Sequence, residues 1–246
     1  MQTAGWIEAV AVEGRSLAAA AGKAGPDSTV PTCPGWQIRD LLRHTGMVHR
    51  WAAAFVIEGH TSYRPDGGEP DLDGDMLLDW FKEGHQLLVT ALDTAPADLA
   101  CWTFLPAPSP LAFWARRQAH ETTVHRVDAE SALGAPATVP AALAADGISE
   151  LLNGFHARAG SRVRTDTPRT LRIRATDTHD VWTVRLSAQP PLAEHGGSGP
   201  VDCELSGPVD RLYLTLWNRL PHSAVEVAGD AGLAELWRER SAVTWS

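Results

Sequence analysis

The sequence predicts an α+β protein, with an N-terminal four-helix bundle and a smaller C-terminal α+β domain. Residues 1–160 show helical apolar periodicity throughout, whereas strand-like and helical segments alternate after residue 165. The chain has 246 residues, of which 44% are hydrophobic and 21% are charged, so it is long enough for two domains that each bury a core. We therefore expect a helical domain at 1–160 and an α+β domain at 165–246.

Four helices are expected in the first domain, and glycine or proline marks their ends. An alanine-rich helix ends at Gly22, a second helix follows the segment VPTCPGW and ends before Gly59, and a proline-rich stretch at 106–110 precedes the fourth. The expected helices span 4–22, 37–58, 72–95 and 111–133. Segment 60–70, rich in Gly, Pro and Asp, is expected to be a loop. Four helices joined mostly by short links are typical of a bundle.

A further helix is expected at 141–159, at the end of the first domain, and strand and helix signals alternate after residue 165. The segments LRIRATDT and VWTVRLSA alternate apolar and polar residues between Thr170 and Ala188, which predicts a β-hairpin that turns at 178–180. Segment 189–200, rich in Pro and Gly, is expected to be a loop. The remaining elements are expected as strand 202–205, helix 209–219, strand 224–227 and helix 231–240.

Charge and hydropathy exclude several classes of protein. A net charge of -9 and a pI near 5.5 argue against nucleic-acid binding, and no apolar run is long enough to span a bilayer. The first residues, MQTAGWIEAVAVEG, lack the basic and apolar regions of a secretory signal. Cys33, Cys101 and Cys203 are odd in number and widely spaced, which argues against a disulfide framework and favours the reducing cytoplasm. The oligomeric state stays open.

Three residues with metal-binding side chains are the main functional signal. Glu121 and His125 lie four residues apart in one expected helix, so their side chains can converge on one point. His44 lies at the border of the apolar face of another expected helix and points toward neighbouring helices. Two imidazoles and one carboxylate leave a position open on zinc, as in catalytic sites, and the same set suits iron, nickel or manganese. A polar core pair is the alternative for Glu121 and His125.

His120, Glu121 and His125 look like the metalloprotease motif HExxH, but their spacing differs. The protease motif places its two histidines four residues apart, on one face of a helix. His120 and His125 are five residues apart, so on a helix with about 100° per residue they point roughly 140° away from each other. They cannot both bind one ion from an unbroken helix, and a peptidase is not expected.

Three segments of the chain resemble a known family: VPTCPGWQIRDLLRH, FWARRQAHETTVHRVDAE and LSGPVDRLYLTLWNRLPHSAVEVAGD. Together they are similar to the mycothiol-dependent maleylpyruvate isomerase family, part of the wider DinB-like superfamily of metal-binding four-helix bundles. The resemblance implies a divalent metal, usually zinc, held by His44, Glu121 and His125. It also implies a functionally important arginine in the C-terminal domain, which matches Arg219 in the LWNR segment.

The resemblance further implies mycothiol as a thiol cofactor or co-substrate. Its sulfur would take the open metal position and lose its proton. The thiolate could add to an activated alkene and leave after rotation, giving cis–trans isomerisation, or remain attached, giving S-transfer to a small electrophilic substrate. Arg219, with Arg116 or Arg117, is a candidate for binding a substrate carboxylate. Asp128, three residues after His125, is a candidate for orienting an imidazole.

Simpler interpretations stay open for several of these residues. Arg116, Arg117 and Arg126 also fit salt-bridged helix positions, Asp128 fits a solvated helix position, and His49 fits a packed or surface histidine. The alternative function is a non-catalytic metal-binding or stress-response protein of the DinB-like superfamily. The open coordination position favours the enzyme.

Overall fold

A computed structural model describes residues 1–242 of the chain, which divides into two compact units. The first unit comprises residues 1–137, and the second begins at Thr138. The boundary expected from the sequence lies later, near residue 160, because local periodicity identifies a helix after residue 141 but not the unit against which it packs. No helix among the described residues has the length and apolar character needed to cross a membrane.

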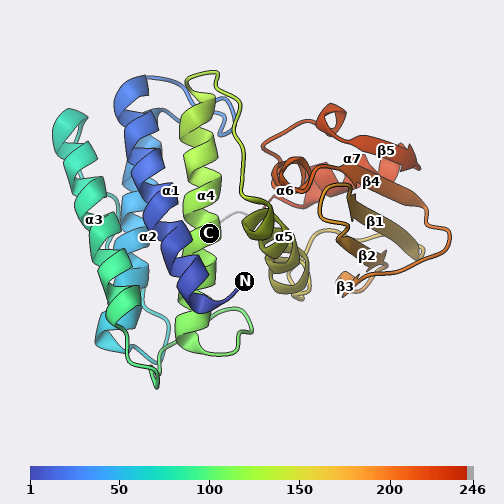
Figure 1. The fold of residues 1–246 in the computed structure, drawn as a ribbon, viewed down its shortest axis with the longest axis horizontal. Helices are drawn as coiled ribbons and strands as arrows, with labels where there is room; N and C mark the ends of the chain where they lie inside the picture. Colours follow the sequence, from blue (N-terminus) through green and yellow to red (C-terminus); the bar gives the residue numbers. More distant parts are fainter. Residues whose placement is uncertain (243–246) are drawn as a thin grey trace. The chain divides into compact units, whose positions relative to one another are not determined.

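The first unit consists of four helices, as the sequence predicts. They are α1 (Thr3–Ala24), α2 (Ile38–Glu58), α3 (Gly74–Thr94) and α4 (Pro110–Ser131). Each helix packs against two others, so that α1 and α2 occupy diagonally opposite positions in the bundle (Figure 1). Buried apolar side chains from all four helices fill the space between them.

Local sequence determines the ends of α2 and α4, the two helices that carry the candidate metal ligands. At the start of α2, the backbone N–H of Gln37 donates to Asp40 Oδ2 at 2.9 Å, and at its end Gly59 adopts a left-handed conformation with φ of 63°. At the start of α4, Ser109 Oγ accepts from the N–H of Ala112 at 3.1 Å, and Pro110 occupies the first turn.

The second unit is built around a five-stranded sheet with strand order β3-β2-β1-β4-β5. The strands are β1 (Arg169–Ala175), β2 (Val181–Leu186), β3 (Leu192–His195), β4 (Cys203–Gly207) and β5 (Glu226–Gly229). The helices are α5 (Ala141–Glu150), its π-helical continuation η1 (Leu151–Phe155), α6 (Val209–Leu216), the short η2 (His222–Ala224) and α7 (Ala231–Arg240). The predicted hairpin forms between β1 and β2, and β1 also pairs in parallel with β4. The predicted α+β fold class is confirmed.

Three sequence-based expectations for the second unit were wrong in detail. Strand β3 lies within the expected loop 189–200 and pairs with β2 at the sheet edge, where Leu192 is 64% exposed and no buried face marks the strand. Helix α6 ends at Leu216 instead of Arg219, because Asn218 adopts a φ of 60° that a right-handed helix cannot continue. The helix after residue 141 ends at Phe155 as a π-helix instead of reaching residue 159.

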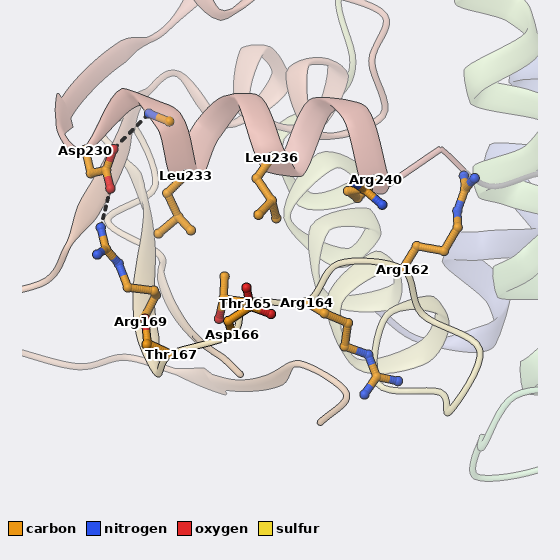
Figure 2. Close-up of a pocket in the computed structure, with 11 residues that line it drawn as sticks. Arg162, Arg164, Thr165, Asp166, Thr167, Arg169, Asp230, Leu233, Leu236 and Arg240 are labelled. Atoms are coloured by element: carbon orange, nitrogen blue, oxygen red, sulfur yellow. Dashed lines mark hydrogen bonds and ion pairs between the residues drawn. The ribbon is translucent and has the colours of Figure 1, made fainter. Parts of the chain in front are cut away.

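A surface depression of about 720 Å³ in the second unit is lined by segment 162–169 and by α7 (Figure 2). The guanidinium of Arg164 donates to the main-chain carbonyls of Ser161, Ala159 and Ala188. Asp230 accepts from the N–H of Gly232 at the start of α7 and pairs with Arg169, as Figure 2 shows. The hydrogen bonds of Arg164 hold the segment that precedes β1 against the sheet, and the ion pair between Arg169 and Asp230 joins β1 to the start of α7.

His156 makes the stability of the second unit dependent on pH. Its ring is 5% exposed and lies edge-on to Trp237, with 4.8 Å between ring centroids. Burial, with a smaller contribution from the positive charge of Arg162, lowers the pKa of His156 to about 4. In the unfolded chain this pKa is about 6.5. Between pH 6.5 and pH 4 the unfolded state therefore binds a proton at His156, whereas the folded state keeps this imidazole neutral. Stability is therefore lost as the pH falls from about 6.5 toward 4.

We expect His156→Phe to remove this acid sensitivity. At about 1.4 kcal/mol per pKa unit, His156 costs the wild type about 2–3 kcal/mol between pH 7 and pH 4.5. Urea unfolding of both proteins at the two pH values measures the effect as a double difference, which cancels the titration of all other groups. An equal loss of stability in wild type and variant on acidification would contradict the assignment.

Candidate metal centre

Helices α2 and α4 bring the three sequence-predicted ligands together in the first unit. His44 comes from α2, Glu121 and His125 come from α4, and one donor atom of each lies within 4.8 Å of the other two. Glu121 Oε1 lies 3.5 Å from His44 Nε2 and 3.2 Å from His125 Nε2. Glu121 and His125 are buried, whereas His44 is 15% exposed. The cluster therefore has a partly open side at His44.

The spacing of the donor atoms fits a tetrahedral divalent ion. Zinc bonds of about 2.0–2.2 Å at tetrahedral angles place neighbouring ligand atoms about 3.4 Å apart. The two separations between Glu121 Oε1 and the imidazole Nε2 atoms, 3.5 and 3.2 Å, lie on either side of that value. Two imidazole nitrogens and one carboxylate oxygen are also a donor set that zinc accepts. The donor set and the two separations from Glu121 Oε1 therefore fit a divalent metal.

Hydrogen bonds and neighbouring charges keep Glu121 ionised between the two imidazoles. Burial alone would raise the pKa of Glu121, but hydrogen bonds from His125 and His44 and the charges of His125 and Arg117 outweigh it and hold the pKa well below its usual range. Burial likewise lowers the pKa of His125, but hydrogen bonds to Asp128 and Glu121 outweigh it and raise the pKa to about 9. Because a metal ligand must be deprotonated, an ion bound here would displace the proton that His125 Nε2 shares with Glu121.

Asp128 supports His125 from the side opposite to Glu121. Its side chain is fully buried, and Oδ2 lies 2.9 Å from His125 Nδ1. Oδ1 accepts a hydrogen bond from Thr32 Oγ1 at 2.6 Å, and Cys33 Sγ lies 3.3 Å from Oδ2. The interpretation of Asp128 as an orienting partner is confirmed, and the solvated position was wrong. Sequence reasoning missed Thr32, because no local pattern connects residues 96 positions apart.

Trp36 covers one side of the cluster. Its ring lies edge-on to His44 at 5.2 Å between centroids and is stacked on His125 at 6.3 Å, with 18° between the ring planes. The segment that carries Trp36 is tied to α4 by the hydrogen bond from Thr32 to Asp128. Trp36 is half-buried, so it forms a wall of the site as well as packing against its ligands.

The other histidines and arginines near the motif have structural partners. His49 is fully buried with Nε2 2.9 Å from Thr122 Oγ1, and burial lowers its pKa well below the usual range. His120 is also fully buried and does not belong to the metal cluster. Arg126 pairs with Glu13 and Glu130, and Arg117 pairs with Glu121. The salt-bridge interpretation of Arg117 and Arg126 is confirmed.

Arg219 lies in the second unit, in the turn that follows α6. The left-handed conformation of Asn218 ends the helix, and the N–H of Arg219 donates to the carbonyl of Leu214 at 2.8 Å. Its guanidinium Nη1 donates to the carbonyl of Trp217 at 3.0 Å. The side chain is half-buried, and its turn is held by main-chain hydrogen bonds.

Comparisons with known proteins match both units to the same family. The family model described as the mycothiol maleylpyruvate isomerase N-terminal domain matches residues 7–130, and the model of the C-terminal domain of the same family matches residues 142–236. A crystal structure of the mycothiol-dependent maleylpyruvate isomerase is similar with a TM-score of 0.62 at 14% identity, covering 93% of each chain. A histidine-to-alanine mutant of that enzyme gives a TM-score of 0.64 at 13% identity, with the same coverage. No curated protein matches the sequence.

Proposed function

Because the chain belongs to the mycothiol maleylpyruvate isomerase family, we propose that it is a thiol-dependent isomerase with a divalent metal, zinc, at His44, Glu121 and His125. The proposed thiol is mycothiol, and the proposed substrate is a small electrophile with an activated cis double bond, such as maleylpyruvate. The observation that carries the proposal is the position of Glu121 Oε1, within 3.5 Å of both imidazole Nε2 atoms.

The residues of the cluster hold and shield a reaction site. Asp128 accepts from His125 Nδ1, which leaves Nε2 of that ring for the ion. Glu121 supplies the negative charge of the ligand set, and Trp36 excludes water from the side that its ring covers. A divalent ion held by these three side chains would leave a coordination position open, and it would keep a thiol bound there deprotonated near neutral pH.

We propose Arg219 as the residue that binds a substrate carboxylate. The support is its match to the functionally important arginine of the family, together with the planar guanidinium, which can bind a carboxylate through two hydrogen bonds. Arg116 lies in the first unit, with its guanidinium 5.8 Å from the centre of the Trp6 ring. Arg117 is excluded from it, because its side chain is 1% exposed.

We place the activity in a reducing compartment, the cytoplasm. Cys33, Cys101 and Cys203 all lie in the described part of the chain, and none of them forms a disulfide. Burial raises the pKa of both Cys101 and Cys203, so these two thiols stay protonated and are weak nucleophiles near neutral pH. Neither of these two cysteines is the proposed nucleophile, which is an external thiol.

Thiol titration into the Co²⁺-loaded protein tests the proposal. We expect mycothiol to produce a sulfur-to-cobalt charge-transfer band that saturates at about one thiol per chain. Incubation of the zinc form with mycothiol and maleylpyruvate should then convert the substrate with thiol recovered unchanged, whereas accumulation of a stable conjugate would indicate S-transfer. Cobalt binding without a thiol band would overturn the enzyme proposal and favour a metal-binding protein without turnover.

A further inference from the structure

Arg117 is a buried arginine one helical turn before Glu121 on α4. Its side chain is 1% exposed, and its Nη2 lies 3.4 Å from Oε2 of Glu121. A guanidinium taken out of water is costly unless a charged partner and good geometry offset the lost hydration. The carboxylate of Glu121 is a charged partner of this guanidinium. Arg117 is therefore part of the charged cluster and has too little exposure to bind substrate.

The two carboxylate oxygens of Glu121 face different partners. Oε1 lies 3.5 Å from His44 Nε2 and 3.2 Å from His125 Nε2, whereas Oε2 lies 3.4 Å from Arg117 Nη2. Rotation about the last side-chain bond would move both oxygens out of these contacts together. The arginine thus opposes the free rotation that a glutamate side chain otherwise has.

Arg117, Glu121 and His125 form a line along one face of α4, at intervals of four residues. Asp128, three residues further, continues the line with its 2.9 Å hydrogen bond to His125 Nδ1. Positive and negative side chains alternate along this line. The two candidate ligands of α4 are therefore held from both ends, Glu121 by Arg117 and His125 by Asp128.

We infer that Arg117 is a positioning residue for the metal centre: it holds Oε2 of Glu121 so that Oε1 stays directed at the point shared with His44 and His125. This inference rests on the proposed metal site. A carboxylate held in this way binds an ion through one oxygen, and the coordination position that its second oxygen would occupy stays available for another ligand.

Zinc affinity of Arg117→Gln, measured by competition with a chromophoric chelator, tests the inference without any assay of activity. We expect the dissociation constant for zinc to rise by about 10-fold or more, the effect typical of losing an outer partner of a metal ligand. The Co²⁺-loaded variant should absorb more weakly in the visible range, because a free carboxylate can bind through both oxygens and raise the coordination number. Arg117→Lys, which keeps the charge but not the planar fork, should show an intermediate rise and serves if Arg117→Gln fails to fold.

Arg126→Gln is the matched control on the same helix. Arg126 is 5% exposed and pairs with Glu13 at 2.8 Å and with Glu130 at 2.6 Å, outside the ligand cluster. We expect this variant to lose unfolding free energy but to keep wild-type zinc affinity. Wild-type affinity in Arg117→Gln, or equal weakening in both variants, would overturn the positioning role.

The outcomes also separate this inference from the proposed function. Zinc binding that depends on Arg117, without any thiol binding, would overturn the thiol-dependent reaction and support the positioning role. Thiol binding together with a zinc affinity that is independent of Arg117 would support the thiol-dependent reaction and overturn the positioning role. A wild-type protein that binds no zinc or cobalt would overturn both.

Discussion

Glu121→Ala is expected to weaken zinc binding by more than about 100-fold, beyond the usual cost of losing an outer partner of a ligand. Glu121 Oε1 lies 3.5 and 3.2 Å from the two imidazole Nε2 atoms, so its loss leaves a gap between the remaining ligands. Glu121 is also the one anion among the three proposed ligands. Without it, the buried charge of Arg117 opposes any cation at the site.

Elemental analysis and thermal unfolding measure this effect together. Wild type should carry about one zinc per chain, and free zinc at about 100 times its dissociation constant should add about 2.7 kcal/mol of stability. Neither effect is expected in Glu121→Ala, and isomerase activity should be lost with the metal. Glu130→Gln, which removes a carboxylate of α4 that pairs with Arg126, is the control and should retain zinc. Stoichiometric zinc in Glu121→Ala would remove Glu121 from the ligand set.

Trp114→Ala is expected to destabilise the first unit by about 3–5 kcal/mol, the range for large-to-small changes of buried aromatic residues. The indole is fully buried, stacks on Phe55 at 5.0 Å between ring centroids, and meets Trp51 edge-on at 5.3 Å. Its N–H donates to the carbonyl of Trp102 at 3.1 Å. The substitution removes these contacts and leaves a cavity that the neighbouring rings cannot fill.

Scanning calorimetry of wild type, Trp114→Ala and Trp114→Phe measures the loss. The phenylalanine variant should lose less than the alanine variant, because a smaller cavity remains. The alanine variant should still bind zinc at low temperature. Trp114 lies seven residues before Glu121 on α4, which is two helical turns or about 10 Å along the helix axis. A loss below about 1 kcal/mol for the alanine variant would show that the aromatic cluster is not a main source of stability.

The helices of the first unit could be predicted from the sequence to within two residues at each end. The expected helices 4–22 and 37–58 correspond to α1 and α2. Helix α2 ends before Gly59 as expected, whereas α1 continues through Gly22 to Ala24 and is capped by Gly25. The β-hairpin and α7 could also be predicted from the sequence. The two-residue period of a strand and the 3.6-residue period of a helix are both visible in residues that are neighbours along the chain. Each of these elements is determined by contacts that are local along the chain.

Strand β3 and the division between the units could not be predicted from local sequence patterns. The segment Leu192–His195 has no alternating pattern with a buried side, and it becomes a strand because the edge of β2 accepts its backbone hydrogen bonds. Helix α5 has an ordinary helical sequence, yet the unit to which it belongs depends on its packing against α6. Partners distant along the chain decide both features.

The candidate site divides along the same line. The convergence of Glu121 and His125 follows from their spacing alone, because a helix places residues four apart on one face. Three other features of the site depend on how the helices pack. His44 meets these two ligands, Thr32 donates a hydrogen bond to Asp128, and Arg117 contacts the second oxygen of Glu121. The physical reason is that helix geometry relates neighbours along the chain, whereas the packing of α2, α4 and the segment before α2 brings distant residues together.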